Sequence, residues 1–387
     1  MKYITTGIDI GTEELKVCVI EHDTKERISR VMGFFKYSVD GIRKGYIYNE
    51  DVFSKSLAKI VRDLEKQIEY KIENAVVSSS SSSIQSFMNA QNGVISKTDG
   101  EVTHFDIDNI EKQLDENAVQ KTRKIIFEQI SEYKIDGKVI EGNPEGLRGV
   151  KLEVKKLFID MLAQHHESIE TLFFENDVEV LLLFPKGLCA SKRLLNEKQK
   201  MVGVCYVDIG SQTTTITVYE SNVIIGYLVI PIGSNDITND IALVLKISLE
   251  EAEQVKRGLS TKIYPKKKLD EIIFSRIEDI CELTQGYLKK IKKNELLPGG
   301  IILNGGGAEV DGIEEYFKKY LQLPVKKSVF EVLTQKKGVV KQTDFIECYA
   351  LALEHQDQEL SQSRKERIPL FEKIKQNSSS FFKQFLP

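Results

Sequence analysis

The sequence predicts an α/β fold of two related lobes that close on a nucleotide between them. Residues Gly7–Thr12 and Tyr206–Ser211, one stretch in each half of the chain, share one pattern. In both, an apolar lead-in is followed by an aspartate, a glycine, a hydroxyl residue and then an alternating strand. A further glycine cluster, Asn304–Ala308, follows the apolar run Ile301–Leu303. An internal duplication that carries a phosphate-type loop in each half indicates a clamp around a nucleotide.

The residue types in these loops suit phosphate and magnesium. Glycine permits a sharp turn and a close approach, and the exposed amides of such a turn bind anions. Asp9 and Asp208 stand at strand ends, where a carboxylate can organise a hydrated Mg²⁺. One such aspartate is more simply an ordinary strand-end residue. Two copies in register, together with the glycine cluster, favour the nucleotide site.

Size and composition narrow the functional classes. A chain of 387 residues suffices for two ordinary domains, and its net charge of −4 gives no support for nucleic-acid binding. The five cysteines form no Cys-x-x-Cys pair, which favours reduced thiols over a disulfide framework or a zinc site. His165 and His166 are expected on a solvated helix face. The first residues run directly into a strand, and no apolar run reaches the length of a membrane span, so we expect a cytoplasmic protein.

The first half predicts a βββα unit. Alternating apolar residues predict strands at 3–10, 15–21 and 28–35. Asn49 is expected to cap a helix whose apolar residues keep helical spacing: Leu57, Ile60, Val61, Leu64 and Ile68.

Six consecutive serines, residues 78–83, interrupt the pattern that follows. Composition alone favours a flexible linker. The flanking segments Ala75–Val77 and Ile84–Phe87 resemble strand ends, however. We therefore interpret the serines as the crossing into an inserted subdomain at 83–165.

The second half repeats the plan. Strands are expected at 201–208, 214–219 and 223–232. A helix follows with Ile237, Ile241, Val244 and Leu245 on one face. Ser248–Glu251 has the pattern of a capping box that opens another helix, and Gly258 is expected to end it.

These motifs resemble the actin-like ATPase superfamily, with its ribonuclease H-like duplicated fold, and within it the FtsA family of bacterial cell-division proteins. The two Asp-Ile-Gly loops and the glycine cluster match the superfamily's two phosphate loops and its adenosine loop. Three further segments are similar to FtsA segments: Gly41–Gly45, Gly149–Lys155, and Ile230–Gly233 with Thr238–Ala242. The similarity spans nearly the whole chain.

The resemblance implies ATP and Mg²⁺ as cofactors. Asp9 and Asp208 would organise the metal, through water, and the attacking water. The cofactor-binding residues would be Gly11, Thr12, Glu13, Gly210, Ser211, Gln212 and Thr213 along the phosphates, Glu253 and Lys256 on the nucleoside, and Gly305, Gly306, Gly307 and Ala308 at the ribose and adenine.

The resemblance also implies a division of the chain. The first lobe (1A) would comprise 1–82 and 166–195, and the inserted subdomain (1C), which makes filament contacts, would comprise 83–165. The second lobe (2A) would comprise 196–236 and 299–355, with its last helix returning to the first lobe, and subdomain 2B would comprise 237–298. Residues 356–367 would form a flexible linker and 368–387 an amphipathic membrane-targeting helix.

The second phosphate loop departs from the family pattern Asp-Ile-Gly-Gly-Gly-Thr-Thr-Asp. Here Ser211 and Gln212 replace two glycines, and Thr215 replaces the final acid. The new side chains either crowd the phosphates or donate hydrogen bonds to them. Threonine cannot replace a carboxylate as a base, so we expect ATP binding with weak or absent hydrolysis.

The C-terminal tail has an amphipathic pattern. Phe371, Ile374, Phe381, Phe382 and Phe385 share one helical face, and Lys383 lies off it. From Arg364 onward six basic side chains accompany two acidic ones. The alternative to a membrane-surface helix is a helix that docks on the protein's own body. The polar tether before it favours the membrane surface.

The functional expectation is an actin-like cell-division protein that polymerises and tethers the FtsZ ring to the inner face of the cytoplasmic membrane at the division site. Its expected partners are the C-terminal peptide of FtsZ on subdomain 2B, other copies of itself, an anionic membrane surface and other divisome proteins, with no nucleic acid. The alternatives are a PilM-like pilus-assembly protein, whose relatives reach the membrane through a partner peptide, and a small-molecule kinase of the same superfamily.

Overall fold

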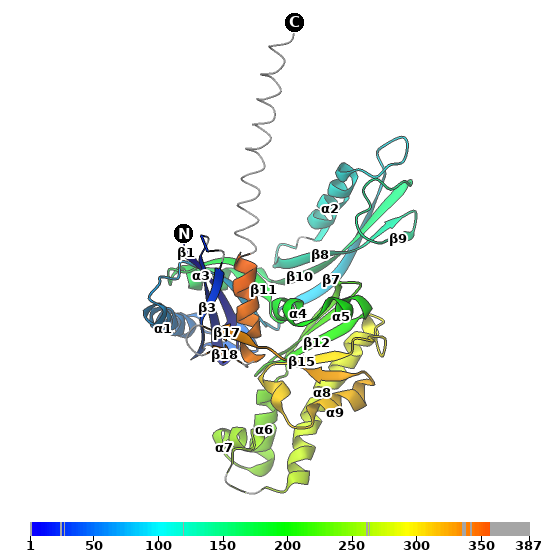
Figure 1. Ribbon diagram of the computed structural model, residues 1–387. Coiled ribbons are helices and arrows are strands. Elements are labelled where there is room, and N and C mark those ends of the chain that lie inside the picture. The colour runs from blue at the N-terminus through cyan, green and yellow to red at the C-terminus, as the bar shows by residue number, and fades with distance from the viewer. Residues whose placement is uncertain are drawn as a thin grey trace.

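Two large sheets and one smaller sheet organise the chain (Figure 1). The computed structural model describes residues 2–356 apart from 24, 27, 119, 261, 263, 335–337 and 341–342. The expected linker beyond residue 356 and the expected amphipathic helix at 368–387 lie outside the described residues.

The first large sheet has the strand order β11-β6-β1-β2-β3-β17-β18. The strands are β1 (Lys2–Ile10), β2 (Glu14–Asp23), β3 (Ile28–Ser38), β6 (Asn74–Ser79), β11 (Glu179–Pro185), β17 (Val332–Thr334) and β18 (Gly338–Val340). Strands β1, β2 and β3 form an antiparallel meander, whereas β6 and β11 add in parallel. The three strands predicted for the first half are confirmed.

The helix α1 (Glu50–Ile68) covers this sheet as its spacing predicted. Asn49 is its N-cap, and its side-chain oxygen accepts a hydrogen bond of 3.1 Å from the amide of Val52. All five predicted apolar residues are buried. Each such side chain contributes about 1.5–3 kcal/mol when it leaves water.

The smaller sheet, with strand order β7-β10-β8-β9, lies within the region predicted as an insertion. Its elements are β7 (Gln85–Val94), β8 (Arg123–Ile135), β9 (Lys138–Ile140), β10 (Lys151–Leu162) and the helix α2 (His104–Ala118). Leu114, Leu152 and Phe158 belong to its own apolar core.

The serine run is not a flexible linker. Ser78 and Ser79 are the last residues of β6, and Ser80 and Ser81 are buried as well. The amide of Ser82 donates to the carbonyl of Lys44 at 3.2 Å. Small hydroxyl side chains suit this place because backbone from another segment approaches closely: a Cβ on Gly45 would collide with the Ser80 carbonyl.

The second large sheet has the strand order β14-β13-β12-β15-β16. The strands are β12 (Val204–Ile209), β13 (Thr214–Glu220), β14 (Val223–Ile230), β15 (Ile301–Asn304) and β16 (Val325–Lys327). The predicted start of the first of these, at residue 201, is wrong. Asn196 and Gln199 form a capping box that opens the helix α5 (Glu197–Val202), and Gly203, at a φ of 100°, ends it.

Helices pack on both large sheets. The helices α3 (Ala163–Phe174) and α4 (Leu188–Leu194) contact β11 of the first sheet. The helices α6 (Ser234–Leu245), α7 (Leu249–Lys256), α8 (Lys266–Lys290) and α9 (Ile313–Leu321) follow later in the chain, with the 3₁₀ turns η1 (Gly306–Glu309) and η2 (Thr343–Phe345). No helix in the described ranges is both long and apolar enough to cross a membrane.

Two expectations about α6 and α7 need correction. Val244 was expected on the buried face of α6, but it is exposed, whereas Ile237 and Ile241 are buried. Ser248 caps α7 as predicted. The second half of the predicted capping box, from Glu251, is replaced by a hydrogen bond of 2.6 Å that its carboxylate accepts from the Tyr264 hydroxyl.

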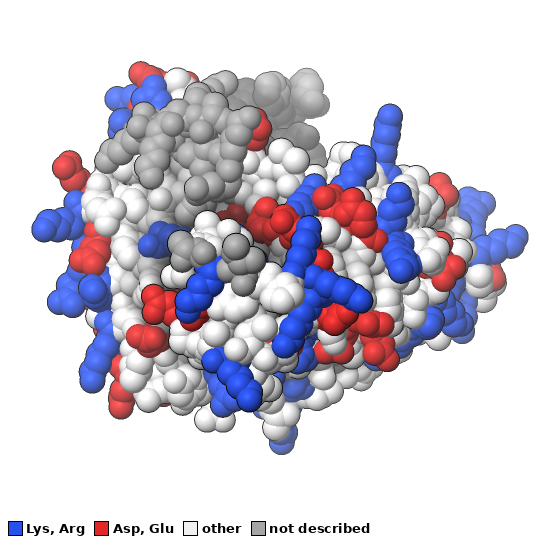
Figure 2. All heavy atoms as spheres, turned by 90° about the horizontal axis from the view of Figure 1, so that it is seen from below, with Lys and Arg blue, Asp and Glu red and all other residues white. Residues whose placement is uncertain are grey.

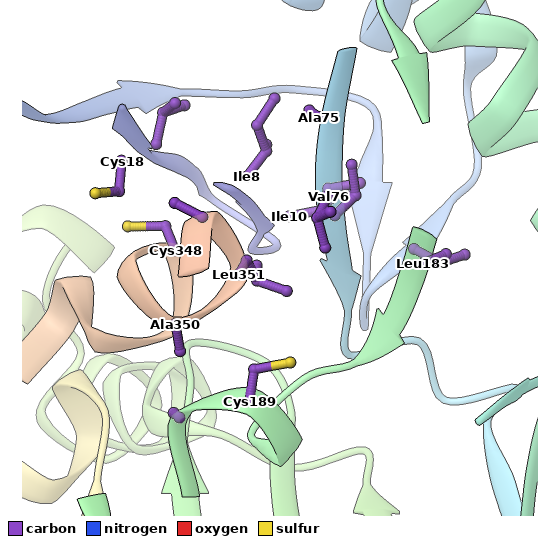
Figure 3. Packing of buried hydrophobic residues seen from close by; sticks show 14 of the residues in the cluster. Ile8, Ile10, Cys18, Ala75, Val76, Leu183, Cys189, Cys348, Ala350 and Leu351 are labelled. Atoms are coloured by element: carbon purple, nitrogen blue, oxygen red, sulfur yellow. The ribbon is translucent and has the colours of Figure 1, made fainter. Parts of the chain in front are cut away.

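The last helix of the described residues, 346–356, packs against the first strand of the chain. A Cβ added to Gly7 would collide with the helix backbone at Cys348 and with the Leu351 side chain. Figure 3 shows Cys348 beside Cys18, and Leu351 on the same helix belongs to the same apolar cluster. Glycine at this strand position therefore permits direct contact between strand and helix backbones.

The short hairpin of β4 (Ile42–Arg43) and β5 (Tyr46–Ile47) precedes α1.

On the face of the molecule seen in Figure 2, acidic and basic side chains alternate.

His165 and His166 are buried, contrary to the expectation of a solvated helix face. The ring of His165 stacks on Tyr46 at 4.2 Å between centroids, and its Nε2 accepts a hydrogen bond from the amide of Ile47. Burial, with a smaller contribution from the neighbouring His166, lowers the pKa of His165 to about 4. The paired histidines carry no local signal of this contact, because the residues they meet lie more than a hundred positions earlier in the chain.

We expect His165 to make the free energy of unfolding fall on acidification. Between pH 6.5 and 4 the unfolded chain binds a proton at this histidine and the folded chain does not, so up to about 3 kcal/mol of stability is lost in this window. The variant His165→Gln keeps an acceptor for the Ile47 amide and should show a flatter profile. Urea unfolding at pH 7, 5.5 and 4.5 measures the difference.

His104→Gln, at an exposed position of α2, is the matched control and should leave the pH profile unchanged. Parallel profiles for the native chain and His165→Gln would contradict the assignment of the acid sensitivity to His165.

Candidate nucleotide-binding site

A cavity of about 770 Å³ opens where loops of the two large sheets face each other. Ten of the predicted cofactor and metal residues line it: Asp9, Gly11, Thr12, Glu13, Gly210, Ser211, Thr213, Glu253, Lys256 and Gly306. They come from both halves of the chain. The described structure thus brings together the two loops that the sequence pattern paired.

Five predicted residues do not line the cavity: Asp208, Gln212, Gly305, Gly307 and Ala308. Gly305 and Gly307 instead pack closely against β12, where Asp208 and Ile209 lie. A Cβ on Gly305, at a φ of 87°, would collide with the Asp208 carboxylate, and one on Gly307 would collide with Ile209. Gly306 is different, because a Cβ there meets no atom within 4 Å.

The first loop is the turn between β1 and β2. The Gly11 amide donates to the Glu14 carbonyl at 3.0 Å and closes the turn. In the described part of the chain, the amides of Thr12 and Glu13 have no acceptor. The turn therefore leaves two amide donors for an anion in the cavity.

The second loop repeats this geometry between β12 and β13. The Gly210 amide donates to the Thr213 carbonyl at 2.8 Å, and the amides of Ser211 and Gln212 have no acceptor within the described ranges. The amides that begin α6, at Ser234 and Asn235, donate back to the carbonyls of Gly210 and Ser211. The helix start thus holds the loop in place.

The hairpin β4–β5 connects the two loops. The amide of Gly45 donates to the Thr12 hydroxyl at 3.2 Å in the first loop. The amide of Lys44 donates to the side-chain oxygen of Gln212 at 3.0 Å in the second loop. Gln212, which stands where the family pattern has glycine, therefore contacts the opposite lobe and does not enter the cavity.

Thr215 also lies outside the cavity. It pairs with Asp208 across β12 and β13 and is buried. Among the described residues its hydroxyl has no hydrogen-bond partner, and it lies against Gly187.

Asp9 is the centre of a buried charge cluster beneath the first loop. The ammonium of Lys186, at the end of β11, lies 2.8 Å from Asp9 Oδ2. The hydroxyl of Ser78 donates to Asp9 Oδ1 at 3.1 Å. Burial acts to lower the pKa of Lys186, but the carboxylates of Asp9 and Asp208 outweigh it and hold that pKa above its usual value.

Two further carboxyl groups belong to this buried region. Burial raises the pKa of Asp208. Burial, reinforced by the Asp9 carboxylate, raises the pKa of Glu347 to about 8, so this side chain is mostly neutral at pH 7. Glu347 Oε2 accepts a hydrogen bond of 3.0 Å from the Ala190 amide.

Glu253 and Lys256 line the cavity as a pair. Lys256 Nζ lies 2.6 Å from Glu253 Oε2 and donates to the Ser234 carbonyl at 3.1 Å. Burial acts to raise the pKa of Glu253, but hydrogen bonds from Lys256 and Thr238 outweigh it and lower that pKa to about 2.

Lys186 and Glu347 were missed in the sequence because no motif marks them. The apolar run Leu181–Phe184 predicts a strand before Lys186, but it does not indicate that the strand end meets the site. The partner of Lys186, Asp9, lies 177 positions away. Glu347 had no comparable signal, since only the docking of the last helix buries it.

Sequence comparisons relate this chain to one family of known proteins. The sequence profile described as "Cell division protein FtsA" matches residues 205–350, and the profile "SHS2 domain inserted in FTSA" matches residues 82–159. Cell division protein FtsA of Pseudomonas aeruginosa is 26% identical over 345 residues, which cover 84% of this chain and 82% of that protein. FtsA of Neisseria meningitidis is 29% identical over 348 residues, covering 84% and 83%. FtsA of Bacillus subtilis is 27% identical over 346 residues, covering 83% and 77%.

Solved structures share the fold. A PilM–PilN type IV pilus biogenesis complex is similar with a TM-score of 0.64 at 13% identity, over 91% of this chain and 98% of that chain. MreB5 of Spiroplasma citri bound to ADP is similar with a TM-score of 0.54 at 12% identity, over 94% and 98%. These likenesses concern the fold alone, and they confirm the predicted actin-like class.

We expect Gln212→Ala to loosen the hairpin β4–β5. The change removes the acceptor of the Lys44 amide, and a hydrogen bond of this kind contributes about 1 kcal/mol, or about fivefold in an opening equilibrium. Hydrogen–deuterium exchange of a peptide covering residues 41–47 should accelerate by about that factor.

Gln113→Ala, which removes an exposed glutamine from α2, should leave this exchange unchanged. Equal protection of residues 41–47 in the native chain and in Gln212→Ala would show that the second loop does not hold the hairpin.

Proposed function

The chain belongs to the FtsA family of cell-division proteins, and from that premise we propose that it is an ATP-binding adaptor that polymerises and tethers the FtsZ ring to the cytoplasmic membrane. The observation that carries the nucleotide part is the cavity between two matched loops, which is lined by Thr12, Glu13 and Ser211, whose amides have no acceptor among the described residues. Amide donors in concave turns suit the oxygens of a polyphosphate.

ATP is the proposed nucleotide, and Mg²⁺ is the cofactor that the family resemblance adds to it. Glu253 and Lys256 are proposed to contact the nucleoside, and Gly306 the ribose and adenine. Thr215 occupies the position of the family's final acid and is buried outside the cavity. No acid at this position of the second loop is therefore proposed to assist hydrolysis. The proposal is therefore a nucleotide-dependent switch or scaffold with weak or absent turnover.

Gly306→Phe tests the cavity. Since a Cβ at Gly306 meets no protein atom within 4 Å and Gly306 lines the cavity, the variant should fold and its ring should fill the space that the nucleotide needs. ATP at about 100 times its Kd stabilises the native protein by about 2.7 kcal/mol, a rise of several degrees in melting temperature, and this rise should vanish in Gly306→Phe.

Gly286→Phe is the matched control, because Gly286 is also a glycine with open space but lies in α8 outside the cavity. It should keep the full response to ATP. A native melting temperature that does not move at millimolar ATP would refute the proposed nucleotide site.

The proposed subdomains are those that the resemblance implied. Lobe 1A (1–82 and 166–195) holds most of the first large sheet, and 1C (83–165) holds the smaller sheet. Lobe 2A (196–236 and 299–355) holds the second large sheet. Subdomain 2B (237–298) holds α7, α8 and most of α6.

Subdomain 2B is the proposed docking surface for the FtsZ C-terminal peptide. Leu243, Leu249 and Leu259 are exposed there, around α6 and α7. Exposed apolar side chains are the kind of surface that a peptide partner covers, and they support this proposal. Filament contacts are proposed for 1C, and other divisome proteins are proposed as later partners.

The C-terminal tail is proposed to lie on the cytoplasmic face of the membrane at the division site. The pattern of Phe371, Ile374, Phe381, Phe382 and Phe385 supports an interfacial helix, and the basic excess supports an anionic surface. One helix of this kind binds reversibly, and several on one filament bind far more tightly.

Ending the chain after Gln356 should abolish binding to anionic liposomes while leaving the response to ATP intact. Phe381→Glu with Phe385→Glu in the full chain should act in the same way, because two charges then enter the apolar layer. Flotation of the native protein with liposomes at low and high salt measures the effect, and binding should weaken as salt rises.

Lys383→Gln is the milder comparison and should weaken binding only in part, since each basic residue contributes about 1 kcal/mol. Flotation of the truncated chain with liposomes would show that another surface binds the membrane, and the proposed tether would be withdrawn.

Of the two alternatives, the small-molecule kinase assigns no role to the tail. The PilM-like reading has a fold likeness in its favour, at 13% identity. The FtsA profiles and relatives, which extend over most of the chain, favour cell division.

A further inference from the structure

The Asp9 carboxylate is already occupied on both oxygens. Lys186 Nζ pairs with Oδ2 at 2.8 Å, and Ser78 donates to Oδ1 at 3.1 Å. Ser78 lies in β6, and Lys186 directly follows β11. The charge that would attract a hydrated Mg²⁺ to Asp9 is therefore neutralised from within the protein.

The second expected metal carboxylate does not face the cavity. Asp208 is buried behind the glycine turn, where the missing Cβ of Gly305 leaves just enough room for it. The two carboxylates that the sequence assigned to magnesium therefore do not fit a carboxylate-anchored Mg²⁺, because Asp9 is already paired and Asp208 does not line the cavity.

Lys186 is placed as a fixed cation at the phosphate end of the cavity. It lines the cavity, and its side chain is 12% exposed. Its backbone is held at both polar groups: the amide donates to the Ser79 carbonyl at 2.9 Å, and the carbonyl accepts from the Tyr227 hydroxyl at 2.9 Å. An ammonium has three N–H donors, and the hydrogen bond to Asp9 uses one of them.

We propose that Lys186, which is paired with Asp9, gives its remaining N–H donors to the phosphate oxygens, so that this chain binds free ATP without Mg²⁺. The inference rests on the proposed nucleotide site and specifies the form of the ligand that it takes. An ammonium donates to phosphate oxygens without a defined coordination geometry. The ion pair removes the repulsion between the Asp9 carboxylate and the phosphates, and the spare donors of Lys186 take the place of a metal ion.

The test compares ATP binding by the full chain in excess Mg²⁺ and in EDTA after removal of bound metal, by isothermal titration calorimetry. The native protein should show Kd values that agree within about threefold in the two buffers. Lys186→Arg should keep this independence. Lys186→Gln should weaken the binding of free ATP by about tenfold or more, with a part of the loss recovered when Mg²⁺ is added.

The outcomes separate this inference from the proposed function. A native protein that binds ATP in Mg²⁺ but about tenfold or more weakly in EDTA overturns the inference and keeps the nucleotide site. No binding in either buffer overturns the proposed nucleotide site itself. If Lys186→Gln fails to fold, as judged by circular dichroism, the native protein and Lys186→Arg decide. A folded Lys186→Gln that binds free ATP as tightly as the native protein overturns the role of Lys186.

Discussion

The ion pair between Asp9 and Lys186 is the interaction on which the region around the cavity depends. It joins β1 to the end of β11, with β6 and its Ser78 hydroxyl between them. Removing one member of a buried pair leaves an unpaired charge, which costs about 3–5 kcal/mol. The first strand and the strand that follows the inserted region must therefore meet in register before the site can form.

The last described helix closes the same region from the other side. It reaches β1 because Gly7 has no side chain, and it brings Glu347 into the interior near the ion pair. A mostly neutral carboxyl adds little charge there, and its hydrogen bond from the Ala190 amide connects this helix to α4. The backbone contact at Gly7 constrains how this helix packs on β1, and movement of one lobe against the other would act on that contact.

Local signals accounted for the repeated units and the two loops. Alternation predicted the strands, and the capping residues Asn49 and Ser248 begin helices where expected. Two predictions failed for different reasons. The strand β12 begins late because a local capping box and Gly203 define a short helix that the strand prediction overlooked. His165 is buried by a distant contact, since Tyr46 stacks on its ring. Composition misrepresented the serine run, since small side chains can also fit a crowded interior.

The sequence alone determined the duplicated plan and the residue types of the loops, because turns, caps and strand alternation depend on neighbours a few positions apart. It also carried the family resemblance that the comparisons confirmed. Tertiary structure alone decided which side chains share the cavity. Gln212 turns to Lys44, Asp208 lies behind Gly305, and Lys186 pairs with Asp9 across 177 positions. Charges are neutralised through space, and no local pattern in a chain reports a partner that only folding brings within 3 Å.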